Sequence, residues 1–377
     1  MWLSSIQLTN FRNYSEAEIA LSSGPILFHG ENGEGKTNLV EAVNFVAGLE
    51  SHRVAGYQTL IQHQKPQTQI VVRGNFKNRE MLVGIEINAD KANRYFVNGN
   101  QVRKSGDLIG LISSVIFAPE DLDIVRRDPS DRRLFLDNAV IQLKPRIQAV
   151  KRDYERVLKQ RNALLKSAKQ VANPDLGTLD IWDDQLVSLG VELILQRISL
   201  IDHLLPLIND FYKKLSGKAE EIELRLVSAI GDDDNFSELP ADSEKLRELF
   251  HEKLKTFRNK ELERGLTLVG PHRDELLIFK DGLVARSHAS QGEAWSLALG
   301  LKLAFAELLK RVSTTGDPIL LLDDVFAVLD VGRRTRLLDF VLDFEQVIVT
   351  AADRSMAPEI AWAKVFHVSD GAVSAED

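Results

Sequence analysis

The chain has 377 residues, 44% hydrophobic and 27% charged, a composition typical of a globular protein with two or three domains. It has no cysteine, which excludes disulfides, thiolate catalysis and cysteine-ligated zinc and fits a reducing cytoplasm. It contains no uncharged apolar run of about eighteen residues, and its N-terminus lacks a basic region followed by an apolar block. We therefore expect neither a membrane span nor a signal peptide.

The net charge of −8 conceals one basic stretch. Residues 126–169 carry thirteen basic and five acidic side chains, a local surplus of eight positive charges. Because charges act on a polyanion over a Debye length of about 8–10 Å, local density matters more than the total. The stretch is therefore interpreted either as a polyanion-binding face or as a solvated helix surface, and charge alone does not separate the two.

Residues 1–118 are predicted to be rich in strands and to contain one helix. Runs typical of strands occur at 6–11, 17–21, 26–29, 69–76, 82–88 and 114–117. The helix is expected from Lys36 to about Leu49, where apolar side chains recur at helical spacing.

Residues 119–262 change to a helical pattern. Apolar side chains recur every three or four positions from 146 to 167 with charges between them, which predicts a packed helix about 33 Å long. A turn is expected at 173–177, and the apolar stretch 179–207 supplies the return helix.

After residue 262 the alternation of strands and helices returns. Strands are predicted at 266–269, 276–279, 319–322 and 346–350, and helices at 291–311 and 333–344. The predicted fold class is therefore α/β. Its domain is formed by residues 1–118 and 263–377 and is interrupted by a helical insert at 119–262.

The strongest motif is a phosphate-binding loop that matches G-x-x-x-x-G-K-[ST] at every defined position. It reads Gly30-Glu31-Asn32-Gly33-Glu34-Gly35-Lys36-Thr37, follows a predicted strand and opens a predicted helix. The glycines let backbone N–H groups face phosphate oxygens, and the helix points its positive dipole end at the same anion. We expect these residues and Asn38 to bind ATP, with Lys36 contacting the β- and γ-phosphates and assisting catalysis, and Thr37 binding Mg²⁺. This context disfavours a plain glycine-rich turn.

Two adjacent acids follow an apolar run far downstream. Pro318-Ile319-Leu320-Leu321-Leu322-Asp323-Asp324 is typical of a buried strand that ends at a nucleotide. Asp323 would hold Mg²⁺, and Asp324 would be catalytic by polarising the attacking water. The alternative is a strand that ends in a surface turn.

A third motif, Ser290-Gln291-Gly292, stands at the start of the helix predicted at 291–311. A hydroxyl, a flexible backbone and a helix dipole together make an anion cradle. The position resembles the signature motif of ABC-type ATPases, in which one subunit covers the γ-phosphate bound to the other in a two-fold dimer. Asp330 similarly resembles the D-loop acid. The alternative for Ser290 is a plain helix N-cap.

With these motifs in place, the chain resembles the RecF family of bacterial recombination-repair ATPases, which are built like an SMC-type head. The matching stretches are Leu8-Thr9-Asn10-Phe11-Arg12-Asn13-Tyr14, the phosphate loop with Asn38, Ser51-His52-Arg53, Phe117-Ala118-Pro119-Glu120-Asp121-Leu122, Pro129-Ser130-Asp131-Arg132-Arg133-Leu134-Phe135-Leu136-Asp137, Gly270-Pro271-His272-Arg273-Asp274, the signature, and Leu322-Asp323-Asp324-Val325-Phe326. They occur in the family's order over nearly the whole chain. The resemblance implies an ABC/SMC-type P-loop ATPase head, a mixed β-sheet with helices, that carries an inserted helical second domain.

The same resemblance implies a weak, DNA-stimulated ATPase that acts as a switch. It implies ATP-dependent homodimerisation on DNA, a preference for double-stranded DNA near single-strand gaps, and contact with single-stranded DNA. It also implies cooperation with RecR and RecO to load RecA, in cytoplasmic DNA repair, replication, recombination and the SOS response. Residues 117–121 would take the place of the Q-loop.

Two positions depart from the expected pattern. Glu293 stands where Gln is usual in the signature, which would weaken its contact with the γ-phosphate. No His occurs at Ala351-Ala352-Asp353, where ABC transporters carry a switch His. No role follows from the residues for 51–53 or 270–274, and His272 is interpreted as a satisfied turn histidine.

Three other protein classes share some of these features. The ATPase subunit of an ABC transporter shares the nucleotide motifs, but the long helical insert and the missing switch His disfavour it. A small-molecule kinase would have no signature. A structural SMC protein needs a long coiled coil, and the predicted helical arm is far too short.

Overall fold

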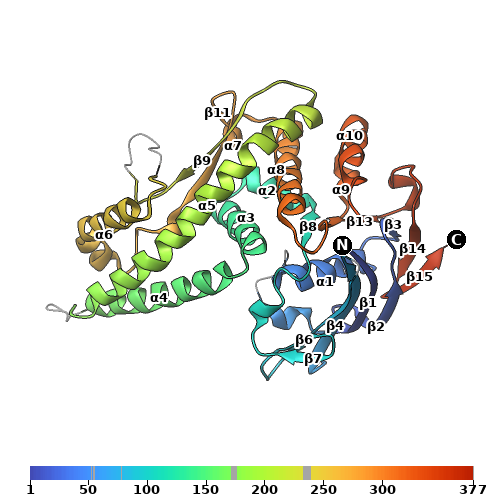
Figure 1. Ribbon diagram of the computed structural model, residues 1–377, viewed down its shortest axis with the longest axis horizontal. Coiled ribbons are helices and arrows are strands. Elements are labelled where there is room, and N and C mark those ends of the chain that lie inside the picture. Colours follow the sequence, from blue (N-terminus) through green and yellow to red (C-terminus); the bar gives the residue numbers. More distant parts are fainter. Residues whose placement is uncertain (52, 54–55, 78, 171–175, 232–238, 377) are drawn as a thin grey trace. The chain divides into compact units, whose positions relative to one another are not determined.

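The computed structural model describes residues 1–376 except 52, 54–55, 78, 171–175 and 232–238. The chain forms two compact units (Figure 1). Unit 1 comprises Met1–Leu122, Asp210–Lys218 and Trp295–Asp377, and unit 2 comprises Asp123–Asn209 and Ala219–Ala294. Unit 2 extends past the predicted boundary at 262 because β10 (Glu275–Lys280) pairs along its length with β9 (Ile222–Val227).

The main sheet of unit 1 combines strands from the N-terminal and the C-terminal parts of the chain. Its order is β15-β14-β3-β13-β12-β8, and all neighbours are parallel except β15. The strands are β3 (Gly24–His29), β8 (Ser114–Phe117), β12 (Ile319–Leu322), β13 (Gln346–Ala351), β14 (Lys364–Ser369) and β15 (Ala372–Glu376). Strands β8, β12 and β13 are buried at every position, as near-continuous apolar runs in a parallel sheet should be.

A second, antiparallel sheet in unit 1 has the order β2-β1-β4-β5-β6-β7. Its strands are β1 (Trp2–Phe11), β2 (Tyr14–Ala20), β4 (Gln67–Phe76), β5 (Arg79–Asn88), β6 (Arg94–Val97) and β7 (Asn100–Val102). Buried residues alternate along β4, as expected for a sheet with one covered face. Helix α1 (Lys36–Gly48) contacts β8 and β13 of the first sheet and β4 of the second, so it lies between them.

The other elements of unit 1 are short or shared. They are η1 (Tyr57–Leu60), η2 (Ser105–Asp107), η3 (Pro119–Asp121), α9 (Val325–Val328), α10 (Val331–Val341), η5 (Arg354–Met356), and most of α8 (Gln291–Val312). Helix α10 begins two residues before the predicted start because the Asp330 carboxylate caps it, accepting the Arg333 N–H at 3.0 Å. Within the described part of the chain, no helix is long and apolar enough to cross a membrane.

Unit 2 is mainly helical. It contains α2 (Leu122–Arg126), α3 (Pro129–Leu143), α4 (Ile147–Ala168), most of α5 (Leu179–Ser216), α6 (Ser243–Arg264), η4 (Pro271–Arg273) and α7 (Ala285–His288), with a small sheet ordered β11 (Leu283–Val284)-β10-β9. Helices α4 and α5 confirm the predicted arm and its return helix. Residues 171–175, which include part of the predicted turn, lie outside the described residues.

The strand predicted at 266–269 is wrong. The N–H groups of Thr267 and Leu268 donate to the side chains of Asn162 and Glu261, each at 2.7 Å, instead of to another strand. Side-chain acceptors thus replace the β-ladder that the apolar pattern suggested.

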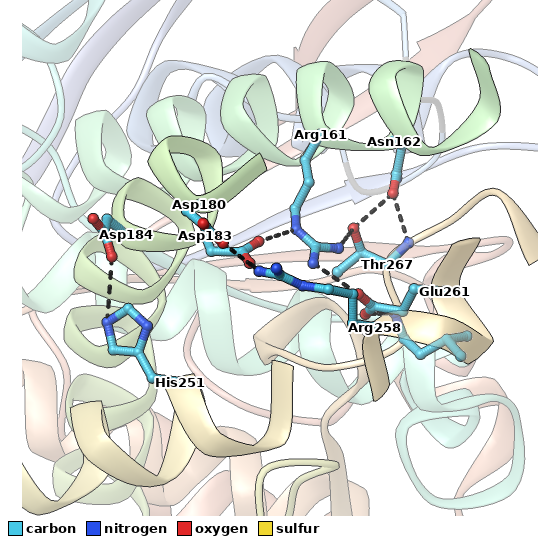
Figure 2. A network of polar contacts seen from close by, with 10 residues as sticks. Arg161, Asn162, Asp180, Asp183, Asp184, His251, Arg258, Glu261 and Thr267 are labelled. Atoms are coloured by element: carbon cyan, nitrogen blue, oxygen red, sulfur yellow. Dashed lines mark hydrogen bonds and ion pairs between the residues drawn. The ribbon is translucent and has the colours of Figure 1, made fainter. Parts of the chain in front are cut away.

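These acceptors belong to a buried ion network that links α4, α5 and α6 (Figure 2). Arg161 has no exposed surface and donates to Asp183 at 2.6 Å, Glu261 at 2.7 Å and the Thr267 hydroxyl at 2.9 Å. Arg258 of α6 donates to the second oxygen of Asp183 at 2.9 Å. All three guanidinium nitrogens of Arg161 are bonded, as a fully buried charge requires, so the network fixes how the three helices meet.

We predict that Arg161→Met destabilises the protein by about 3–5 kcal/mol, because it leaves Asp183 and Glu261 buried without their cation. The matched control is Arg156→Met on the same helix, whose side chain is 70% exposed; it should change stability by no more than about 0.5 kcal/mol. Urea denaturation followed by far-ultraviolet circular dichroism measures both. Equal stability of the two variants would contradict the role given to the network.

Candidate functional site

The phosphate loop leaves β3 and enters α1 at the carboxyl end of the parallel strands. The Lys36 ammonium, in a residue only 3% exposed, donates to the carbonyl oxygens of Gly30 at 2.6 Å and Glu31 at 2.8 Å. The lysine therefore lies inside the loop, with its charge on the concave side.

Two glycines of the loop have no room for a side chain. A Cβ on Gly30 would lie 2.1 Å from the Val368 carbonyl oxygen, and one on Gly35 would lie 2.6 Å from the Asn13 amide nitrogen. Their φ angles of +154° and +119° are also ones that other residues rarely adopt. Both packing and backbone conformation thus require glycine.

Two hairpin turns hold the loop from outside. The Glu34 carbonyl oxygen accepts from the Asn13 side chain at 2.8 Å and from the Gly371 N–H at 3.3 Å, and the Glu34 carboxylate accepts the Asp370 N–H. The side-chain oxygen of Asn13, Oδ1, also accepts from the side-chain amide of Asn38 at 2.7 Å. Asn13 was not predicted as a site residue. The only signal was its place in the matching stretch 8–14.

Tyr14 lies beneath the same loop. It is fully buried, and a Cβ on Gly35 would stand 2.7 Å from its hydroxyl. Among the described residues that hydroxyl has no hydrogen-bond partner. Burial, followed by the charge of Glu34, raises the pKa of Tyr14, so it remains a neutral donor.

The stretch 51–53 packs onto the same helix. Glu41 of α1 is fully buried and receives a two-point bond from Arg12, at 2.7 and 2.8 Å, and a third bond from the Ser51 hydroxyl. Arg53 donates to the Asn38 side chain at 3.0 Å. His52 lies outside the described residues. Ser51 and Arg53 therefore brace the helix that follows the phosphate loop.

The structure brings Thr37 and Asp323 together although 286 positions separate them. The Thr37 hydroxyl donates to Asp323 Oδ1 at 3.1 Å, and the buried Thr350 hydroxyl donates to the same oxygen at 2.7 Å. Thr350 also accepts the N–H of Asp324 at 2.9 Å, so it orients both acids. Sequence reasoning missed Thr350. A polar residue at the end of an apolar strand was the available signal.

The electrostatics at Asp323 favour a cation. Burial raises the pKa of Asp323, and the charges of Asp324 and Glu120 add to the effect, while the bonds from Thr350 and Thr37 oppose it. The donor set, one carboxylate and one hydroxyl beside a loop that faces phosphate, fits Mg²⁺. No cluster of three or more metal-ligating side chains occurs among the described residues.

The segment 117–121 begins at the last residue of β8, and the Asp121 side chain fixes it. Its carboxylate accepts the Ala118 N–H at 2.9 Å and pairs with Lys302 of α8 at 2.8 Å. Lys302 also donates to the Ile116 carbonyl oxygen at 3.0 Å. The position predicted for the Q-loop is thus tied to α8 within unit 1.

The signature belongs to unit 2, where Ser290 caps α8. The Ser290 hydroxyl accepts the Glu293 N–H at 3.3 Å, and the Glu293 carboxylate accepts the Ser290 N–H at 2.8 Å, which forms a capping box. Lys280 pairs with the same carboxylate at 3.2 Å. This accounts for Glu at the position where Gln was expected. Ser290 and Gln291 are exposed and Gly292 is half-buried.

The basic stretch 126–169 is not one surface. Arg132 is 3% exposed and forms a two-point bond to Glu275 at 2.6 and 2.8 Å, and Arg161 is buried in the ion network. The exposed basic residues are Arg126, Arg127, Lys144, Arg146, Arg152, Arg156, Lys159, Lys166 and Lys169. Arg152, Arg156, Lys159 and Lys166 follow at helical spacing, so they form one stripe along α4.

The turn 270–274 joins the helices of unit 2. Arg197 of α5 donates to the carboxylate of Asp274 at 2.9 Å and to the Pro271 carbonyl oxygen at 2.7 Å, and Arg133 of α3 donates to the Asp274 carbonyl oxygen at 2.7 Å. His272 Nδ1 lies 2.7 Å from the Tyr154 hydroxyl, and its Nε2 lies 3.3 Å from the Thr267 carbonyl oxygen.

The partners of His272 fix its proton. A carbonyl oxygen only accepts, so Nε2 carries the proton, and Nδ1 accepts from Tyr154. Burial, together with Arg273, Arg133 and Arg161, lowers the pKa of His272 to about 4, although the bond to Thr267 opposes the shift. His272 is thus a neutral, satisfied turn histidine.

Comparison with known sequences gives full-length matches. A family profile described as the RecF/RecN/SMC N terminal domain matches residues 2–374. The chain is 45% identical over 382 residues to the DNA replication and repair protein RecF of Leifsonia xyli subsp. xyli, covering 99% of both proteins. It is 41% identical over 391 residues to the RecF of Cutibacterium acnes, covering 100% of this chain and 98% of the relative.

Comparison with solved structures agrees with the sequence matches. The recombination mediator protein RecF-ATP of the RecFOR pathway superposes with a TM-score of 0.91 at 27% identity, over 100% of this chain and 98% of that one. An SMC head bound to the C-winged helix domain of ScpA gives a TM-score of 0.56 at 17% identity, covering 100% of this chain and 97% of that one, which is a likeness of fold alone. The predicted ABC/SMC-type head fold is confirmed.

The lowered pKa of His272 gives a test of its burial in the turn 270–274, through the pH dependence of stability. In the unfolded chain its pKa is near the ordinary 6.5, whereas in the folded protein it is about 4. The unfolded state therefore binds more protons between these values, and stability falls as pH decreases through that window. By pH 5 the loss attributable to His272 should be about 2 kcal/mol relative to pH 7. Urea denaturation at both pH values should show a smaller loss for His272→Gln than for the unsubstituted protein; equal losses would contradict the assignment.

Proposed function

Because the chain belongs to the RecF/RecN/SMC N-terminal domain family, we propose that it is an ATP-driven DNA-binding protein of recombinational repair and replication. In this proposal it binds ATP and Mg²⁺ at residues 30–38 and dimerises on DNA near single-strand gaps in the cytoplasm. It hydrolyses ATP slowly, and DNA stimulates that hydrolysis. The nucleotide then serves as a switch for holding DNA.

The observation that carries the proposal is that Thr37, Asp323 and Thr350 meet at one edge of the sheet. There the parallel strands β3, β12 and β13 have their carboxyl ends. In open α/β sheets this edge is where ligands bind. The Thr37–Asp323 hydrogen bond of 3.1 Å joins the phosphate loop to the pair of acids at the end of β12, which lies far downstream in the sequence. A hydroxyl and a carboxylate beside a phosphate loop are the ligands that a Mg²⁺–nucleotide requires.

Each residue has a distinct task in this proposal. Lys36 exchanges its bonds to Gly30 and Glu31 for bonds to the β- and γ-phosphates, which keeps its buried charge paired. Thr37 and Asp323 hold Mg²⁺, which when bound offsets the charge that develops on the phosphates. Asp324, oriented through its N–H by Thr350, polarises the attacking water.

The signature would complete the site from the partner subunit. Ser290 uses its oxygen to cap α8, but its hydroxyl proton is available to a phosphate oxygen because a hydroxyl both donates and accepts. Glu293 is engaged by the Ser290 N–H and by Lys280, so its role in this proposal is to shape the cap. ATP bound between two subunits then links nucleotide state to dimerisation.

DNA binding is assigned to the stripe on α4. The guanidinium groups of Arg152 and Arg156 are 74% and 70% exposed, and their ion pairs with Asp153 at 3.7 and 3.4 Å are of the weak surface kind. Such cations contact phosphates without reading base edges, so sequence preference should be small. The double-stranded and gapped DNA preference, contact with single strands, and cooperation with RecR and RecO to load RecA rest on the family resemblance.

Two substitutions should separate ATP binding from dimerisation. Lys36→Ala should abolish both, because it removes the cation of the loop. Ser290→Arg should leave ATP binding by the monomer intact but block dimerisation, because the bulky cation would occupy the place of the partner's γ-phosphate contact. Nucleotide titration and size-exclusion chromatography with light scattering, with and without ATP and gapped DNA, distinguish these outcomes. ATP-dependent dimers of Ser290→Arg would show that the signature assignment is mistaken.

The DNA surface is tested by salt dependence. The triple variant Arg152→Gln, Arg156→Gln, Lys159→Gln should reduce the slope of log affinity against log salt for duplex DNA by about two to three, since each phosphate contact contributes roughly 0.9. The control Lys245→Gln, Lys255→Gln, Arg264→Gln removes the same charge from exposed positions on α6. If both triples change the slope equally, only net charge matters and the stripe has no special role.

A further inference from the structure

Unit 2 contains a cavity that the proposed ATPase cycle does not use. It has a volume of about 240 Å³ and lies entirely within unit 2, between α3, α4, α5 and the turn at 271–272. Two of the stretches that carry the family resemblance, 129–137 and 270–274, contribute to its lining. Neither has a place in the nucleotide site.

One side of the cavity is apolar. Leu134, Leu158, Leu193 and Pro271 line it, and Leu134 is 47% exposed. A large apolar side chain that is half in water, beside a cavity with further apolar walls, provides a surface on which another apolar group gains by burial.

The other side carries three cations, Arg133, Lys151 and Arg197, beside the carboxylates of Asp137 and Glu155, and among the described residues Arg133 is the one of these cations that forms no ion pair. Arg197 is saturated by Asp137 at 2.7 Å, Asp274 at 2.9 Å and a backbone carbonyl oxygen. Arg133 donates to the Asp274 carbonyl oxygen at 2.7 Å, and among the described residues no carboxylate lies within ion-pair distance of its guanidinium. Most of its five N–H donors thus have no acceptor in this part of the chain.

The surroundings of Arg133 hold charges of both signs. Burial and the neighbouring charge of Arg197 lower the pKa of Arg133, although the charges of Glu275, Asp274 and Asp137 oppose the shift. Because the pKa stays lowered, these carboxylates do not fully offset the burial of the cation, and a further anion at the guanidinium would favour its charged form. His272 on the cavity wall is neutral and supplies no charge. Lys151 adds a cation at the edge, paired at 3.4 Å with Glu155, whose side chain is 60% exposed.

We propose that this cavity docks an acidic peptide segment of a partner protein, with a carboxylate on Arg133 and an adjacent apolar side chain against Leu134, Leu158 and Pro271. An arginine binds a carboxylate through two parallel bonds, and the apolar wall explains why a bare phosphate would use only part of the site. DNA phosphates are instead served by the stripe Arg152, Arg156 and Lys159. That stripe lies on a different face of α4 from Lys151, Tyr154 and Leu158, which line the cavity.

The test begins with a displayed library of random eight-residue peptides, selected on the full-length protein without ATP. Enriched peptides should carry Asp or Glu within two positions of Leu or Phe. A fluorescein-labelled peptide of an enriched sequence, measured by fluorescence anisotropy, should bind Arg133→Gln at least tenfold more weakly. The matched control Arg127→Gln removes a 70% exposed guanidinium outside the cavity and should leave its affinity unchanged.

A second variant covers the case in which Arg133→Gln folds poorly. Leu134→Ser alters an exposed position and should weaken the same peptide at least threefold with unchanged circular dichroism. Lys36→Ala should bind the peptide as the unsubstituted protein does, so failure of the ATP site would not affect this result.

Four outcomes would overturn the proposal. The first is that the enriched peptides carry no acidic residues, and the second is that neither Arg133→Gln nor Leu134→Ser changes the affinity for the peptide. The third is that inorganic phosphate displaces the peptide with an affinity that Leu134→Ser does not change. The fourth is that duplex DNA displaces the peptide and Arg133→Gln weakens DNA binding as much as peptide binding. The last outcome would make the cavity part of the DNA surface.

Discussion

A single carboxylate oxygen ties the nucleotide-facing parts of unit 1 together. Asp323 Oδ1 accepts from Thr37, the second residue of α1, and from Thr350, the second-last residue of β13. These bonds bring together residues from the first and last thirds of the chain. They are possible because β3, β13 and β12 are parallel neighbours, so their carboxyl ends lie at the same edge of the sheet. The sheet order is therefore the constraint on which the geometry of the site depends.

The phosphate loop is also held from outside by backbone geometry. Glu34 is bonded by both the β1–β2 and β14–β15 turns, and Gly30 and Gly35 fit where any Cβ would collide with neighbouring atoms. A loop fixed in this way needs little rearrangement to receive phosphate, which lowers the entropic cost of binding. Inside this loop the buried Lys36 ammonium is held by the carbonyl oxygens of Gly30 and Glu31.

Unit 2 shows how misleading a count of charges can be. Arg132 and Arg161 belong to the basic stretch that suggested a polyanion surface, yet both are buried and paired with carboxylates. Their charges hold helices together, whereas the exposed cations of α4 remain for a ligand. Some cations of the stretch are buried and others exposed because only residues three or four positions apart share a face of a helix. The packing of neighbouring helices then determines which face is buried. Arg133 is intermediate between the buried, paired cations and the exposed ones: it is half-buried and donates to a backbone carbonyl oxygen.

The sequence by itself determined the motifs whose chemistry is local. The phosphate loop needs only its own glycines, lysine and threonine, and the strands β3, β8, β12 and β13 follow from apolar runs that a parallel sheet buries on both faces. The helical arm and the α/β class of the fold were likewise predictable, because periodicity reflects local burial. Only the tertiary structure decided that Thr350 orients both acids, that Asn13 and Tyr14 lie at the loop, and that residues 266–269 form no strand. Those features depend on partners that stand up to several hundred positions away, and no local pattern records which distant side chain will satisfy a given hydrogen bond.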